Sequence, residues 1–172
     1  VATYELSDVI AEGYDAGVRL GEHVAKDMVA VRLGPDIPMA IVGAPGYLQA
    51  NPAPASPQEL AGHRGINLRL PTPGTVNAWR LMQGGREIRV RVEGPLVLST
   101  IELILDAVLA GLGLAYLPLD QVEPHLREGR LVQVLGEWTP PLPGYHLYYA
   151  SRCRVSPAFR LLINALRYRG PS

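Results

Sequence analysis

The sequence predicts an α/β fold with a largely parallel or mixed sheet, divided into two lobes. Short apolar runs alternate along the chain with segments that carry helix-start signals. Hydrophobic residues make up 48% of the 172 residues and charged residues 19%, which excludes intrinsic disorder. Pro-rich breaks near residues 34–38 and 139–144 bracket a middle segment. The chain is therefore expected to build lobe one from residues 1–36 and 145–172, and lobe two from 37–144.

Nine segments are predicted to form strands, because each is a short apolar run or alternates with a period of two between turn signals. Asp15–Leu20 and Met28–Leu33 are closed by Gly21 and by Gly34-Pro35, and both are expected to be buried. In chain order the nine segments are Asp15–Leu20, Met28–Leu33, Met39–Val42, Ile66–Leu70, Glu87–Glu93, Leu96–Leu98, Leu114–Leu117, Leu131–Leu135 and His146–Ala150.

Helix-start signals precede four further segments. Each begins with a Ser or Asp that can cap the first turn, and Glu59 and Glu102 complete a capping box in two of them. The predicted caps are Ser56, Ser99, Asp120 and Ser156. A short helical segment is also expected after Ala44-Pro45-Gly46.

The helix expected from Ser99 to about Ala110 is apolar on every side apart from Glu102 and Asp106. Such a helix is typically buried on two sides. In so small a chain, we expect another subunit to cover the second side, and so we predict self-association.

Charge and cysteine content exclude several classes of protein. The chain has 16 Lys and Arg and 16 Asp and Glu, so its formal net charge is zero. This argues against binding of DNA phosphates by this chain alone, because such binding depends on clustered positive charge. Cys153 is the one cysteine, so a disulfide framework is excluded. No run approaches the roughly 18 apolar residues of a membrane span, and the start VATYELSD does not resemble a signal peptide. A soluble cytoplasmic protein is expected.

No pattern for catalysis, a metal or a cofactor is present. The patterns GxSxG, SxxK, GxGxxG and GxxxxGK[ST] are all absent. Cys153 lies between Arg152 and Arg154 and is expected to be an inert thiol. The histidines are scattered, without the spacing of a metal site: His23, His63, His125 and His146. We therefore expect no enzyme activity, no metal and no cofactor.

Seven blocks along the chain have a family-like order and spacing, and together they cover essentially its whole length. They are EGYDAGVRLG at 12–21, APGYL at 44–48, SPQELAGH at 56–63, AGLGLAYLP at 110–118, EGRLV at 128–132, Trp138, and PGYHLYY at 143–149. This series resembles the effector-binding domain of LysR-type transcriptional regulators.

The resemblance implies a two-lobe, periplasmic-binding-protein-like (type II) fold that binds a small organic molecule, expected to be anionic, in the cleft between the lobes. It also implies DNA binding through an N-terminal winged helix-turn-helix and a homodimer or higher homo-oligomer in the full-length protein. The helix-turn-helix is not found in this chain. The first strand and first helix of lobe one are also expected to be missing, because Val1–Asp8 matches a point near the second strand.

Seven residues are predicted to contact the ligand: Arg19, Asn67, Leu68, Arg69, Ser99, Thr100 and Ile101. The N-H groups at a helix start attract carboxylates and phosphates, and in the family the corner that matches Ser99 lines the cleft. Arg19 and Arg69 can each pair bidentately with a carboxylate. Asn67 and Leu68 share the strand of Arg69, along which the crevice of the family passes.

Other interpretations stay open at this point. Ser99 can serve only as a cap, and each arginine can be an ordinary surface or salt-bridged residue. The same architecture also serves solute-binding proteins of transport systems, although the absence of a signal peptide counts against that class. A small α/β enzyme is a further alternative with little support.

Overall fold

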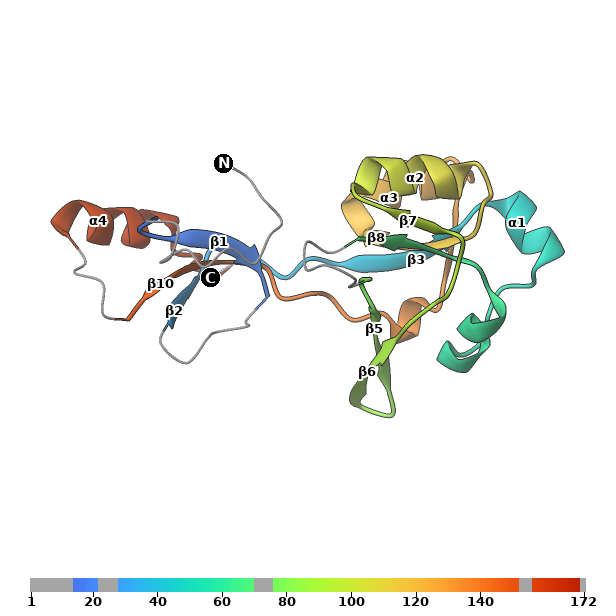
Figure 1. The fold of residues 1–172 in the computed structure, drawn as a ribbon, viewed down its shortest axis with the longest axis horizontal. Helices are drawn as coiled ribbons and strands as arrows, with labels where there is room; N and C mark the ends of the chain where they lie inside the picture. The colour runs from blue at the N-terminus through green and yellow to red at the C-terminus, as the bar shows by residue number, and fades with distance from the viewer. Residues whose placement is uncertain (1–13, 22–27, 70–75, 152–155, 171–172) are drawn as a thin grey trace. The chain divides into compact units, whose positions relative to one another are not determined.

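The computed structural model describes residues 14–21, 28–69, 76–151 and 156–170. The chain forms two compact units (Figure 1). Unit 1 contains Pro38–Pro140, and unit 2 is built from the segments before and after it. The chain enters unit 1 between Ile37 and Pro38 and leaves it between Pro140 and Pro141, both in Pro-rich stretches.

Unit 1 is built on a five-stranded mixed sheet with the order β7-β4-β8-β3-β9. Strand β4 is parallel to both β7 and β8, whereas β3 is antiparallel to β8 and β9. The strands are β3 (Met39–Gly43), β4 (Gly65–Leu68), β7 (Leu96–Leu98), β8 (Leu114–Pro118) and β9 (Val132–Val134). The α/β class and the mixed sheet predicted from the sequence are confirmed.

Helices α2 (Ile101–Leu109) and α3 (Leu119–Arg127) cover one face of this sheet (Figure 1). The core between them contains Val42, Ile66, Ile104, Val108, Leu117 and Val122. Unit 1 also contains α1 (Pro45–Ala50) and two 3-10 helices, η1 (Pro57–Gly62) and η2 (Gly136–Trp138).

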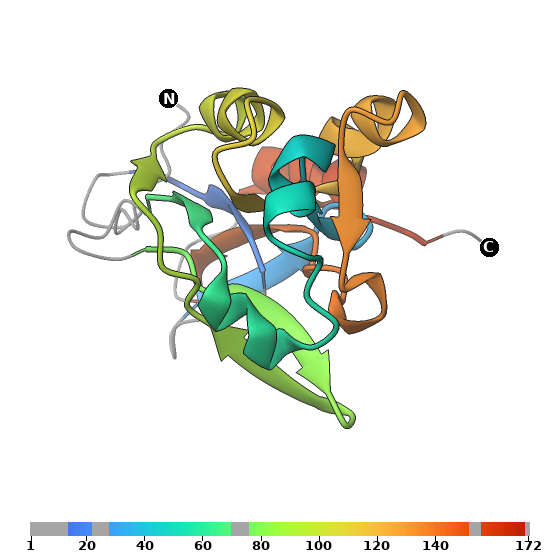
Figure 2. The same ribbon diagram turned by 90° about the vertical axis from the view of Figure 1, so that its right-hand side faces the viewer.

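A β-hairpin packs on the opposite face of the sheet from α2 (Figure 1 and Figure 2). It is formed by β5 (Trp79–Gln83) and β6 (Arg86–Val90). Gly84 and Gly85 both have positive φ at its turn, a conformation that glycine adopts without steric cost. The sequence predicts β6 but not β5. Trp79 of β5 is 1% exposed and stacks on Tyr116 of β8 with the ring centroids 6.1 Å apart.

Unit 2 contains a three-stranded antiparallel sheet with the order β1-β10-β2. Its elements are β1 (Gly17–Leu20), β2 (Met28–Arg32), β10 (Tyr145–Ala150) and α4 (Pro157–Leu166). The prediction that β1 and β2 are buried strands is wrong for most of their residues: Val18 is 54% and Leu20 46% exposed, and Val31 alone is buried. The described core of this unit is small and gathers around Val31, Leu147 and Ile163.

Two of the four predicted helix caps differ from the structure in position. Thr100, not Ser99, caps α2, and its hydroxyl accepts the Leu103 N-H at 3.4 Å. Pro118 occupies the N-cap of α3, so Asp120 lies inside the first turn, where its carboxylate still suits the helix dipole. In both cases the N-cap is a residue near the predicted one, because the short sequence pattern does not specify which of the nearby residues begins the helix.

The other two predicted caps have contrasting outcomes. Ser156 caps α4 as predicted, because its hydroxyl accepts the Phe159 N-H at 3.1 Å. Ser56 precedes a 3-10 helix and accepts no N-H bond from it. Its hydroxyl instead donates to Glu59, whose other carboxylate oxygen accepts the Ala55 N-H at 2.9 Å. None of the helices in these described ranges is long and apolar enough to cross a membrane.

We predict that Tyr116→Phe stabilises unit 1. The Tyr116 hydroxyl is buried and has no hydrogen-bond partner among the described residues, an arrangement that costs about 1–3 kcal/mol. The free energy of unfolding in urea should therefore rise by about 1 kcal/mol. Tyr47→Phe is the matched control, because the Tyr47 hydroxyl accepts the Arg64 N-H at 3.0 Å; this variant should lose stability. A lower stability of Tyr116→Phe would contradict the prediction.

The same tyrosine should make stability depend on pH at alkaline values. Burial raises the pKa of Tyr116 from 10.0 to about 12, with a smaller lowering effect of Arg80 and a smaller raising effect of Glu87. Because the folded-state pKa is the higher one, this contribution is complete below about pH 10 and is lost as the pH rises toward 12. Urea unfolding at a series of pH values should show a smaller decline for Tyr116→Phe than for the parent chain.

Candidate functional site

The carboxyl ends of the parallel strands gather most of the predicted ligand residues at one edge of unit 1. Strands β4 and β7 pair in parallel with Leu68 opposite Leu98. Arg69 and Ser99 are the next residues of these two strands, so they leave the sheet at the same edge. In open α/β sheets this edge is where ligands bind.

Arg69 has a fixed backbone and an exposed side chain. Its N-H donates to the Leu98 carbonyl at 2.7 Å, and it forms an isolated bridge with Val76. No carboxylate within the described ranges lies within ion-pair distance of its guanidinium. The positively charged guanidinium of Arg69 is therefore exposed to solvent at the sheet edge. Its paired N-H donors can bind a carboxylate through two parallel hydrogen bonds.

The start of α2 supplies neutral donors beside that cation. Because Thr100 makes the cap, the hydroxyl of exposed Ser99 is not used by the helix, and the interpretation of Ser99 as only a cap is wrong. The first-turn N-H groups of a helix have no intrahelical partner and carry partial positive charge. Ile101 is half-buried and packs against the core of unit 1, which anchors the corner.

Asn67 is buried, and both polar atoms of its amide are used within unit 1. Its Nδ2 donates to the Val92 carbonyl at 2.8 Å, and its Oδ1 accepts the Trp79 indole N-H at 3.1 Å. The residue is 3% exposed. In this structure Asn67 therefore positions β4, and Leu68 packs partly buried against the core beside it. Contact of either residue with a ligand stays a prediction.

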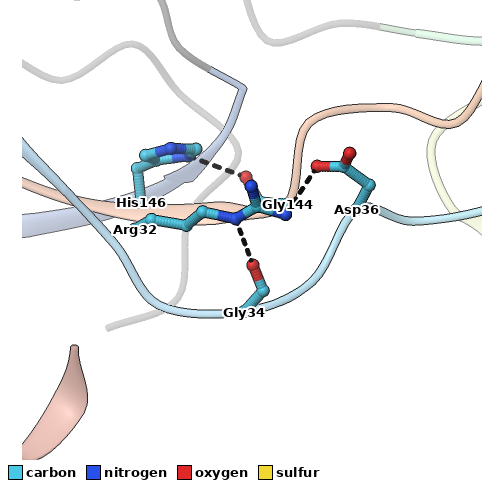
Figure 3. Close-up of polar contacts among 5 residues, drawn as sticks. All are labelled: Arg32, Gly34, Asp36, Gly144 and His146. Carbon is cyan, nitrogen blue, oxygen red and sulfur yellow. Dashed lines mark hydrogen bonds and ion pairs between the residues drawn. The ribbon is translucent and has the colours of Figure 1, made fainter. Parts of the chain in front are cut away.

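Arg19 belongs to unit 2, where it lies in a cross-strand row of basic residues. On β10, His146 is opposite Arg19 of β1 on one side and Arg32 of β2 on the other. Arg32 donates to the Gly34 carbonyl and to the Asp36 carboxylate, both at 2.9 Å (Figure 3).

His146 itself is 5% exposed, and its Nδ1 lies 2.9 Å from the Gly144 carbonyl (Figure 3). Each of these bonds is local to one of the two segments of unit 2, and the pairing of β10 with β2 joins the two segments. The row thus has a structural role through Arg32 and His146, while a ligand contact of Arg19 stays a prediction.

The donor set at the unit 1 edge suits binding of an anion better than acid-base or metal chemistry. It consists of a guanidinium, a hydroxyl and backbone N-H groups. Within the part of the chain that the structure describes, no group of three or more His, Cys, Asp or Glu side chains could hold a metal ion. Cys153 and His23 lie outside the described residues.

From the sequence, Trp79 is interpreted as a packing or rim aromatic; the structure buries it, but its hydrogen bond to Asn67 at this edge is not predicted. Trp79 is the indole partner of Asn67 and reaches it from the unpredicted strand β5. The only local signal was the Gly84-Gly85 turn, which implies a strand on both sides.

A family model described as LysR substrate binding domain matches residues 1–171. The chain belongs to this family and corresponds to the effector-binding domain of a LysR-type regulator, as the resemblance in the sequence indicated.

Two relatives illustrate the similarity. HTH-type transcriptional regulator PgrR of Escherichia coli (strain K12) is 57% identical over 167 residues, which cover 97% of this chain and 56% of the relative. A putative transcriptional regulator of Pseudomonas aeruginosa is 48% identical over 168 residues, 98% of this chain and 55% of the relative. The chain thus spans about half the length of these relatives, which are named as transcriptional regulators and not as enzymes.

Solved structures agree with the fold. The CrgA regulatory domain of Neisseria meningitidis, a LysR-type regulator, has a TM-score of 0.64 and 26% identity, over 91% of this chain and 76% of its own. Full-length AphB of Vibrio cholerae has a TM-score of 0.70 and 23% identity, over 94% of this chain and 54% of its own. The predicted two-lobe type II fold class is confirmed.

We predict that Asn67→Ala lowers the free energy of unfolding by about 2–4 kcal/mol, because it leaves the Trp79 N-H and the Val92 carbonyl buried without partners. Urea unfolding followed by Trp fluorescence measures this. Asn164→Ala, at an exposed position of α4, is the control and should change stability little. Equal stabilities of the Asn67 variant and the parent chain would contradict the role of this amide.

Proposed function

We propose that this chain senses a small organic anion at the carboxyl edge of the unit 1 sheet and thereby controls a DNA-binding regulator. The observation that carries the proposal is the convergence of Arg69, Ser99 and Thr100 at one edge, in a domain whose family binds effectors. An exposed guanidinium that has no carboxylate partner among the described residues, beside hydroxyl and N-H donors, favours a carboxylate or a similar anion. Arg19 of unit 2 stays a candidate contact.

DNA contact is assigned to a part of the protein outside this chain. The relatives are nearly twice as long and are named HTH-type or transcriptional regulators, whereas this chain has equal numbers of acidic and basic residues. A neutral domain has no excess of cations with which to displace the counterions of DNA. A regulator of this kind would work in the cytoplasm.

A thermal-shift screen of this chain against aromatic and aliphatic organic acids should give a saturable hit. A ligand that binds only the folded form stabilises it by about 2.7 kcal/mol at 100 times its Kd. For that hit, we predict that Arg69→Ala and Thr100→Ala each weaken binding by about tenfold or more. Thr100→Ser keeps the hydroxyl and the cap, so its affinity should stay near that of the parent chain.

Glu102→Gln separates an electrostatic effect from a structural one. Glu102 is the acidic residue in the first turn of α2, so its neutralisation should strengthen anion binding or leave it unchanged. Full affinity in both Arg69→Ala and Thr100→Ala would refute the site while leaving the family assignment intact.

We also propose that α2 and the edge strand β7 form a contact between copies of this chain. Among the described strands, β7 pairs only with β4, and Leu103 of α2 is 49% exposed. The buried side of α2 contains Ile104, Ala107 and Val108, and its exposed side carries Leu103 between the acidic residues Glu102 and Asp106.

Light scattering at high concentration should show self-association that Leu103→Glu abolishes, because a carboxylate in an apolar interface must be desolvated. Val132→Glu is the matched control. Val132 is 42% exposed on β9, the opposite edge strand of the same sheet, and the substitution should leave the oligomer intact. A monomeric parent chain would disprove the contact.

A further inference from the structure

A groove of about 630 Å³ lies in unit 1 at the edge opposite the candidate ligand site. Arg64, which lines it, precedes β4, whereas Arg69 follows the same strand. Four residues lie between the two arginines, and five steps of extended chain place their Cα atoms about 16 Å apart. The groove volume is in the range typical of small-molecule sites.

The groove is open because the chain turns there without large side chains. Gly111 follows the end of α2 at Leu109, and Gly129 follows the end of α3 at Arg127; both glycines line the groove and have positive φ. Leu109 and Pro45 add apolar wall to the groove. Its surface is thus mainly apolar and backbone, with two arginines, Arg64 and Arg130, as the charged groups.

Only Arg64 carries a charge that is not already matched. The Nε of Arg130 lies 2.6 Å from the Glu128 carboxylate. No carboxylate among the described residues lies within ion-pair distance of Arg64. A guanidinium stays charged at all physiological pH values, so Arg64 leaves one positive fork in an apolar groove.

Tyr47 holds Arg64 in place from two sides. The Arg64 guanidinium lies 5.5 Å above the centre of the Tyr47 ring, and the Tyr47 hydroxyl accepts the Arg64 backbone N-H at 3.0 Å. The tyrosine is 3% exposed, so it is itself immobile. The backbone and the guanidinium of Arg64 both contact the buried Tyr47 side chain. The Arg64 side chain therefore loses less conformational freedom when an anion binds.

His63 supports this arrangement. Its Nδ1 lies 3.2 Å from the Tyr47 hydroxyl. Burial lowers the pKa of His63, against smaller raising effects of Glu59 and the Pro52 backbone, so the ring is favoured in its neutral form. A neutral Nδ1 can accept a hydrogen bond from the Tyr47 hydroxyl. The Tyr47 oxygen can then accept the hydrogen bond from the Arg64 backbone N-H.

We propose that this groove is a second ligand site, which binds a small organic monocarboxylate with an apolar body. The carboxylate pairs bidentately with Arg64, and the apolar body lies along Leu109 and Pro45. The site is independent of the effector edge, because it shares none of the residues assigned there.

The test is a ¹⁵N-NMR titration of this chain with phenylacetate, using phenylacetamide as the neutral counterpart. We expect saturable shifts at the amides of Gly46, Gly111 and Gly129 with phenylacetate and about tenfold weaker binding of the amide. Arg64→Gln should weaken phenylacetate binding by about tenfold or more. Arg86→Gln, which removes the same charge from the hairpin, should leave it unchanged.

Gly46→Leu tests the groove without touching a charge. Gly46 lines the groove and a Cβ there would meet no atom within 4 Å, so we expect the leucine to occupy groove volume and binding to be lost. The proposal is overturned by an absence of saturable shifts up to about 10 mM phenylacetate. Equal binding of phenylacetamide, full affinity in Arg64→Gln or Gly46→Leu, or shifts confined to Arg69 and Thr100 would also overturn it.

Discussion

The buried amide of Asn67 is the interaction on which the rest of unit 1 depends. It bonds the Trp79 indole on one side and the Val92 carbonyl on the other, and so ties β4 to the hairpin strand β5 and to the segment that follows β6. A buried amide is tolerated only when its polar atoms are paired, which makes the geometry of this bridge specific. Arg69 follows Asn67 by two residues, so the hydrogen bonds of Asn67 also determine where Arg69, the candidate ligand-binding residue, leaves the sheet.

The two candidate sites of unit 1 follow from the direction of its parallel strands. Strand β4 begins after Arg64 and ends before Arg69, and each arginine therefore stands at one edge of the sheet. At the carboxyl edge the cation is accompanied by the hydroxyl and N-H donors of the α2 start. At the opposite edge it rests on Tyr47 beside an apolar wall. The same residue type thus meets different surroundings, which suit different anions.

Much of the fold could be predicted from local patterns, because capping and periodicity act over a few residues. The strand that ends before Arg69 and the helix that follows Ser99 were both expected. The choice of cap could not be predicted, since Ser99 and Thr100 are adjacent hydroxyls with the same capping chemistry. The hydrogen bond between Asn67 and Trp79 could not be predicted either, because the two residues are 12 positions apart and meet only through β5.

By itself the sequence determined the α/β class, the order of the strands and helices apart from β5, and the membership in the LysR substrate-binding family, because these depend on local periodicity and on motifs spread along the whole chain. Only the tertiary structure decided which polar groups are used internally and which are free. The amide of Asn67 is hydrogen-bonded within unit 1, Ser99 does not cap α2, and the Arg64 guanidinium lies over the Tyr47 ring. Each of these outcomes depends on the burial and pairing of residues that are brought together by folding. The identity of one residue in the sequence does not specify its burial or its hydrogen-bond partners.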